Sequence, residues 1–203
     1  MQIPVLLGIL IILVLWSQYE IRKTKRIMKH KEESFWQMER DANTVRKVDI
    51  TNLNYIKIPV DELPMTEHED PSVNDYRNIV RSLSDKKILN LTGISNTELK
   101  LSYGTGNIHL LTEYDTNYTQ LVSTLHKWGD RLYSLGYITD AIKVLECSIH
   151  CHTDSGSTYK LLASIYKEQN RQDKIDLLID LLSGSSIQRK EELLEALKKI
   201  KIS

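Results

Sequence analysis

The feature that most constrains this chain is an apolar run at its amino terminus. Ile3 to Trp16 reads IPVLLGILIILVLW without a charged residue, and the first charged side chain is Glu20. A helix over residues 1–19 would be roughly 28 Å long, close to the roughly 30 Å of a bilayer's hydrocarbon core. We therefore expect residues 1–19 to form a transmembrane anchor.

Aromatic and basic residues follow the apolar run and give it a direction. The residues expected at the membrane interface are Trp16, Tyr19, Arg22, Lys23, Lys25 and Arg26. Aromatic rings favour the interface, and Lys and Arg are retained on the cytoplasmic side. The expected localisation is therefore the cell membrane, single-pass, with the carboxy-terminal part cytoplasmic. A cleaved signal peptide is the alternative, but it would carry its positive charge before the run and small residues after it.

The remaining chain is expected to be mainly α-helical. Residues 9–58 contain neither Gly nor Pro, so the anchor should continue directly into a second helical segment. The expected segments after the anchor are a basic juxtamembrane helix (20–45), an extended, acidic linker (46–72), a region of short helices (73–120), two helical hairpins (121–184) and a carboxy-terminal capping helix (185–203).

One short helix in the 73–120 region carries clear boundary signals. Ser95 followed by Glu98 is a capping box, and Gly104 is placed to end the helix. Nucleic-acid binding through residues 91–106 is a third hypothesis for the function, but a helix-hairpin-helix loop would need a second glycine where Ser95 stands. Lys plus Arg equal Asp plus Glu at 27 each. The overall charge therefore predicts no nucleic-acid partner.

The sequence from about Leu121 to Gly184 predicts two 34-residue units of paired helices, counted from Val122 and from Gly156. Small residues at Gly129 and Ala141 would let the two helices of the first hairpin approach closely. The residues expected to pack within and between the hairpins are Gly129, Ala141, Leu145, Leu162, Ala163 and Tyr166. The pattern resembles the tetratricopeptide repeat (TPR), and the resemblance implies an α-solenoid; a plain helical bundle is the alternative. It departs from that repeat at Trp128, Ser148, Thr153 and Ile175.

A second resemblance covers most of the chain. The segment Phe-Trp-x-x-Glu-x-x-Ala-Asn-x-x-Arg consists of Phe35, Trp36, Glu39, Ala42, Asn43 and Arg46. With the amino-terminal anchor and the TPR-like helices, this segment resembles an uncharacterised family of bacterial single-pass membrane proteins. The resemblance implies an architecture and no activity.

The expected function is protein–protein interaction or scaffolding by a membrane-anchored cytoplasmic TPR-like protein. If the repeats bind a peptide, the groove would be lined by the first helix of each hairpin. The groove residues would be His126, Asp130, Tyr133, Lys160, Ser164 and Lys167. A solvated helix face is the alternative interpretation of the same residues. The sequence determines neither the partner nor the oligomeric state.

No arrangement of residues points to catalysis, so we expect no enzyme, no catalytic residues, no cofactor and no metal. The alternative function is a metal-binding or catalytic helical domain that uses Cys147, His150, Cys151 and His152. A structural zinc site needs four ligands, and the usual Cys-x2-Cys spacing is missing. Two cysteines four residues apart in a helix also favour a reducing compartment over a structural disulfide.

Overall fold

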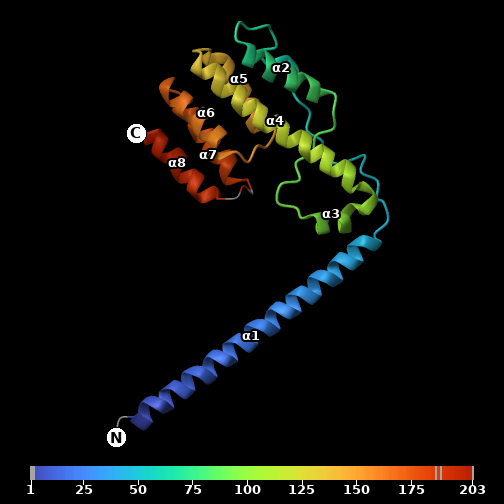
Figure 1. Ribbon diagram of the computed structural model, residues 1–203. Helices are drawn as coiled ribbons and strands as arrows, with labels where there is room; N and C mark the ends of the chain where they lie inside the picture. The colour runs from blue at the N-terminus through green and yellow to red at the C-terminus, as the bar shows by residue number, and fades with distance from the viewer. Residues whose placement is uncertain (1–2, 186, 188, 203) are drawn as a thin grey trace. The chain divides into compact units, whose positions relative to one another are not determined.

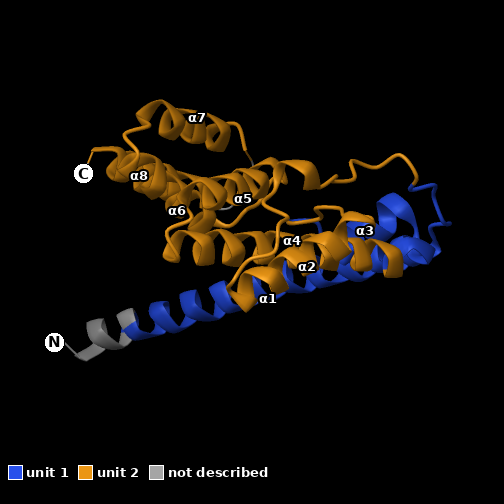
Figure 2. Cartoon of the chain, turned by 90° about the horizontal axis from the view of Figure 1, so that it is seen from above, with its two compact units in different colours: residues 1–50, 93–108 blue, residues 51–92, 109–203 orange. Residues whose placement is uncertain are grey.

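A computed structural model describes residues 3–185, 187 and 189–202. All regular secondary structure in these residues is helical (Figure 1). The chain divides into two compact units, each built from two segments (Figure 2). The first consists of Met1–Ile50 and Gly93–Ile108, and the second of Thr51–Thr92 and His109–Ser203. The expectation of a mainly α-helical protein is confirmed.

The first unit is dominated by α1 (Ile3–Thr44), which covers both the predicted anchor and the basic segment after it. Part of the predicted anchor lies outside the described residues, namely residues 1 and 2 and the side chains of residues 3–7 and 9. In the part of the chain with described side chains, no helix is both long and apolar enough to cross a membrane.

The first unit also contains α3 (Asn96–Tyr103) and the 3-10 turn η2 (Thr105–Asn107). The capping box predicted for α3 is confirmed. The Ser95 hydroxyl accepts a hydrogen bond from the Glu98 N–H at 3.3 Å, and the Glu98 carboxylate accepts one from the Ser95 N–H at 2.7 Å. Gly104 ends the helix with a φ of +79°, which is a backbone conformation that glycine tolerates best.

The end of α1 packs on α3 through a polar cluster. The Glu39 carboxylate accepts a hydrogen bond from the Thr97 hydroxyl and another from Lys100 Nζ, the latter at 2.8 Å. These two hydrogen bonds lower the pKa of Glu39 and keep it charged. Ala42, one turn further along α1, is fully buried.

The chain after α1 is held against the end of α3. The Val48 N–H donates to the carbonyl of Tyr103 at 3.1 Å, and Asn107 Nδ2 donates to the carbonyls of Val48 and Tyr103, each at 2.7 Å. A Cβ on Gly104 would clash with the Arg46 carbonyl and lie 2.9 Å from the Lys47 nitrogen. Gly104 thus permits both the turn and the close approach of the two backbones.

The second unit contains the remaining helices. These are the 3-10 turn η1 (Val60–Glu62), α2 (Pro71–Ser84), α4 (Ile108–Ser134), α5 (Ile138–His150), α6 (Gly156–Glu168), α7 (Gln172–Ser183) and α8 (Lys190–Ile202). From α5 to α8, each helix packs on the next, and α8 also packs on α6 (Figure 1). Residues 46–59 contain no helix. They form the first part of the segment 46–72, which was expected to be an extended linker.

The helix α4 crosses the boundary that we expected at residue 120, between the short helices and the first hairpin. The reason is local. Residues 108–128 contain no Gly or Pro, and Leu111, Tyr118, Leu121 and Leu125 form a continuous buried stripe. The first helix of the first hairpin is therefore the second half of a longer helix.

Polar side chains of α4 anchor the loop that precedes α3 in the sequence. Asn117 Nδ2 donates to the carbonyl of Lys87 at 3.0 Å, and the Asp115 carboxylate accepts from the Leu91 N–H at 3.0 Å. The Tyr118 hydroxyl accepts from Asn90 Nδ2 at 2.9 Å and donates to the His152 carbonyl at 2.7 Å. These hydrogen bonds give partners to loop backbone groups that have none within a helix or a sheet.

Candidate functional site

The two hairpins consist of α4 with α5 and of α6 with α7. The residues predicted to pack them are buried: Ala141, Leu145, Leu162 and Ala163 are fully buried, and Gly129 and Tyr166 are nearly so. A Cβ on Gly129 would lie 2.6 Å from both Cγ and Cδ2 of Leu145. The missing side chain at Gly129 therefore makes room for Leu145 of α5, whereas the sequence analysis paired Gly129 with Ala141.

The six predicted groove residues come from α4 and α6, and two of them connect these helices. His126 Nδ1 lies 3.2 Å from the Thr158 hydroxyl, and the Tyr133 hydroxyl donates to the Glu168 carboxylate at 2.7 Å. The hydrogen bond to Glu168 raises the pKa of Tyr133 and keeps the phenol protonated. The first helices of the two hairpins, α4 and α6, are thus neighbours.

The other four groove residues differ in exposure. Asp130 and Lys160 are exposed, whereas Ser164 and Lys167 are half-buried. This face therefore offers two exposed side chains of opposite charge and a tyrosine that is already hydrogen-bonded. It is polar and accessible, and these residues alone select no particular ligand.

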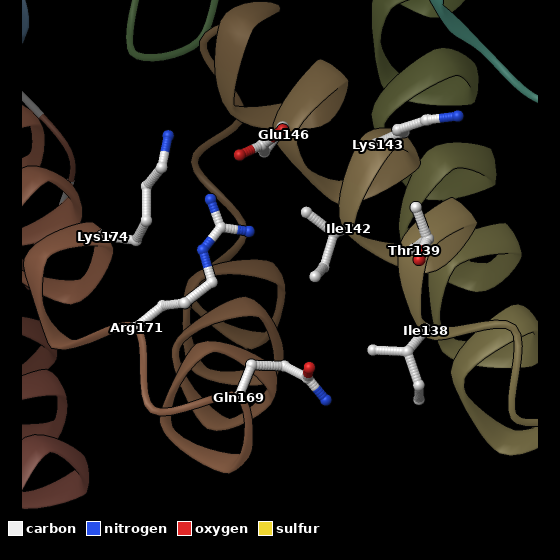
Figure 3. Close-up of a pocket in the computed structure, with 8 residues that line it drawn as sticks. All are labelled: Ile138, Thr139, Ile142, Lys143, Glu146, Gln169, Arg171 and Lys174. Carbon is white, nitrogen blue, oxygen red and sulfur yellow. The ribbon is translucent and has the colours of Figure 1, made fainter.

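A cleft lies on different faces of the same hairpins, beside α5 and the start of α7 (Figure 3). Its volume is about 370 Å³. The lining residues are Ile138, Thr139, Ile142, Lys143, Glu146, Gln169, Arg171 and Lys174. The sequence analysis did not predict this site, because it considered only the first helix of each hairpin.

The position of Arg171 in the cleft is fixed by its neighbours. Its guanidinium carbon lies 5.1 Å from the centroid of the Tyr166 ring, within the range of a cation–π contact. The Tyr166 hydroxyl donates to the Glu146 carboxylate at 2.5 Å. Burial, followed by this hydrogen bond, raises the pKa of Tyr166, so the ring stays neutral.

The Cys147, His150, Cys151 and His152 group does not converge. Both thiols are free and buried, whereas His150 and His152 are exposed. The hydrogen bond to Cys151, together with burial, raises the pKa of Cys147 and keeps this thiol protonated. Among the described residues, no three His, Cys, Asp or Glu side chains come together as a metal site.

The residues predicted at the membrane interface lie on α1. Trp16 and Tyr19 are exposed by 63% and 62%. The basic residues Arg22, Lys23, Lys25 and Arg26 are also exposed. Lys23 lies 3.8 Å from Glu20, one turn earlier.

Comparison with protein-family models, with curated proteins and with solved structures found no match to this chain.

Proposed function

We propose that this chain is a membrane-anchored interaction protein whose α-helical hairpins bind a partner protein. In this proposal, residues 1–19 anchor the chain in the cell membrane and the hairpins are a divergent TPR-like solenoid on the cytoplasmic side. The anchor would raise the effective concentration of the hairpins toward partners at the same membrane. The resemblance to uncharacterised bacterial single-pass proteins supports the same architecture.

One observation carries the membrane part of the proposal. The six consecutive apolar side chains from Leu10 to Leu15 each expose between 47% and 67% of their surface. Contiguous apolar surface of this kind marks a contact with lipid or with protein. The exposed rings of Trp16 and Tyr19 and the basic residues that follow support lipid, because this is their usual order at a membrane interface.

The interaction part of the proposal is supported by the hairpins. The successive first helices α4 and α6 are connected through His126 and Tyr133, and α8 covers the last hairpin with its buried Leu193 and Leu197. A terminal helix that covers the apolar side of the last repeat is usual in solenoids. Solenoid surfaces commonly serve to bind other proteins.

Membrane fractionation tests the anchor. The full chain should remain in the membrane pellet after alkaline carbonate extraction, and a Leu13→Arg variant should move toward the soluble fraction, because a charge near the centre of a span costs about 2.5–3.5 kcal/mol. Leu177→Arg, at an exposed position of α7, is the matched control and should stay in the pellet. A wild-type chain found in the soluble fraction would contradict the anchor.

Topology requires a separate measurement. A carboxy-terminal tag should be protected when protease is added to intact cells and digested once the membrane is opened. Digestion in intact cells would place the hairpins outside and overturn the proposed orientation.

Partner capture tests the groove. The full chain and a Tyr133→Ala/Lys160→Ala double variant are extracted in mild detergent and used in parallel pull-downs from membranes. We expect the variant to lose a partner that the wild type retains. Identical partner lists would refute binding through the α4–α6 face.

A further inference from the structure

The cleft beside α5 and α7 combines an apolar wall with cationic side chains. Ile138 and Ile142 of α5 form the apolar part, and Arg171 and Lys174 at the start of α7 bring the charge. In Figure 3 the Arg171 side chain extends toward Ile142 and Glu146, whereas the Lys143 ammonium points away from Ile142. The cleft therefore offers a cation directly beside aliphatic surface.

Two cations of the cleft, Arg171 and Lys174, outnumber its one carboxylate that has no cationic partner. Lys143 lies 3.5 Å from the carboxylate of Asp140, whereas the Glu146 carboxylate accepts a hydrogen bond from the neutral Tyr166 hydroxyl and keeps its negative charge in the cleft. Arg171 and Lys174 have neither an ion pair nor a side-chain hydrogen bond with any residue that the structure describes. The carboxylate nearest to them in sequence, Asp173, is exposed and does not line the cleft.

Both cations are half-buried, which separates them from ordinary surface lysines. Arg171 is also held in place by its contact with the Tyr166 ring, so less side-chain freedom remains to be lost when it binds a ligand. A guanidinium in a fixed orientation favours a planar, bidentate acceptor such as a carboxylate. The volume of the cleft, about 370 Å³, lies in the range of roughly 300–1,000 Å³ that is usual for ligand sites.

We infer that this cleft binds an acidic segment of a partner protein, in which an Asp or Glu side chain stands next to an aliphatic residue. The carboxylate pairs with Arg171 and Lys174, and the aliphatic side chain packs on Ile138 and Ile142. This inference rests on the proposed interaction function and assigns it a site on α5 and α7 in place of the α4–α6 face. Glu146 disfavours a second acidic residue at its end of the cleft.

The experiment uses the full chain in detergent micelles and a fluorescent peptide with one acidic residue, Gly-Leu-Glu-Leu-Gly-Gly, blocked at both ends. Blocking leaves the Glu side chain as the peptide's only acid. Fluorescence anisotropy should show saturable binding that weakens with salt, because the contact is ionic. The same peptide with Gln in place of Glu should bind at least tenfold more weakly.

The cleft is tested by an Arg171→Gln/Lys174→Gln double variant, which should reduce the affinity at least tenfold. A Lys198→Gln/Lys199→Gln variant on the exposed face of α8 removes the same charge and should bind like the wild type. A single Lys174→Glu variant leaves the Arg171–Tyr166 contact in place and should also lose binding. Circular dichroism compares the helix content of all variants.

Three results would overturn the inference. The first is that the wild type does not bind the acidic peptide. The second is that the cleft variants bind the peptide as tightly as the wild type does. The third is that the α8 variant loses as much affinity as the cleft variants. A pull-down with the cleft variants shows whether only the cleft assignment fails or the proposed interaction function as a whole. If the cleft variants capture the same partner as the wild type, the interaction function stands and the cleft is not its site. If the wild type captures no partner, the proposed function fails.

Discussion

Replacing Gly104 by alanine should destabilise the first unit more than any other glycine-to-alanine change in that unit. With a φ of +79° and a ψ of +150°, Gly104 lies in a backbone region that only glycine populates freely, and a side chain there costs about 1–3 kcal/mol. The new Cβ would also lie 2.6 Å from the carbonyl carbon of Arg46. Its neighbours are backbone atoms that cannot rotate away, so overpacking adds about 1–3 kcal/mol.

Gly93 is the matched control, because it has a φ of +85° and open space where its Cβ would be. Alanine there should cost only the conformational penalty, about 1–2 kcal/mol. The two variants should therefore differ by about 1–4 kcal/mol, with the clash accounting for most of the difference.

The assay combines urea unfolding, followed by circular dichroism, with hydrogen exchange on the full chain in detergent. The local reporter is the Val48 N–H, which donates to the Tyr103 carbonyl at 3.1 Å next to the glycine. Its exchange should accelerate in Gly104→Ala and remain slow in Gly93→Ala. Equal unfolding free energies and equal Val48 exchange in the two variants would refute the steric argument.

Three further predictions concern single side chains. The hydrogen bond from Arg131 lowers the pKa of Asp70, so this carboxylate stabilises the fold at neutral pH, and the stabilisation is lost as pH falls below about 3.9. In the Asp70→Asn variant, the thermal unfolding midpoint should therefore fall less steeply as the pH is lowered. Leu197→Ala should cost about 2–5 kcal/mol in urea unfolding because Leu197 is fully buried, whereas Leu181→Ala, at a side chain that is 60% exposed, should be nearly neutral. Glu39→Ala removes the acceptor of two hydrogen bonds from α3 and should accelerate hydrogen exchange throughout α3. Unchanged exchange would show that apolar packing alone holds that helix.

The sequence predicted the elements whose signals are local. The capping box of Ser95 and Glu98 and the stop at Gly104 involve residues within nine positions, and the structure has all three in these roles. The helix α6 begins at Gly156, where the second repeat unit was expected. Such features depend on short-range hydrogen bonds and glycine conformations, which a single sequence displays directly.

Contacts between distant segments could not be predicted in the same way. Glu39 and Lys100 are 61 residues apart, and no periodicity relates them. Glu39 of α1 nevertheless pairs with Lys100 of α3, and Ala42, one turn later in α1, is fully buried. Phe35 and Trp36 of α1 are exposed by 48% and 54% and contact each other edge to face, with ring centroids 5.5 Å apart.

The cleft was missed for a different reason. Its residues are individually ordinary, and only the packing of α5, α6 and α7 brings Ile142 beside Arg171. A search for basic residues at the start of the second helix of each hairpin would have identified Arg171 and Lys174. The predicted groove lies on the first helices, α4 and α6, whereas the cleft is lined from α5 and the start of α7.

The continuity of α4 has a consequence for how this chain can vary in length. Asp115 and Asn117 in its first half hold the loop around residues 87–91, while Gly129 in its second half faces Leu145. One inserted residue between these halves would rotate one set of contacts by about 100° relative to the other. Insertions or deletions should be tolerated here only in steps close to whole helical turns.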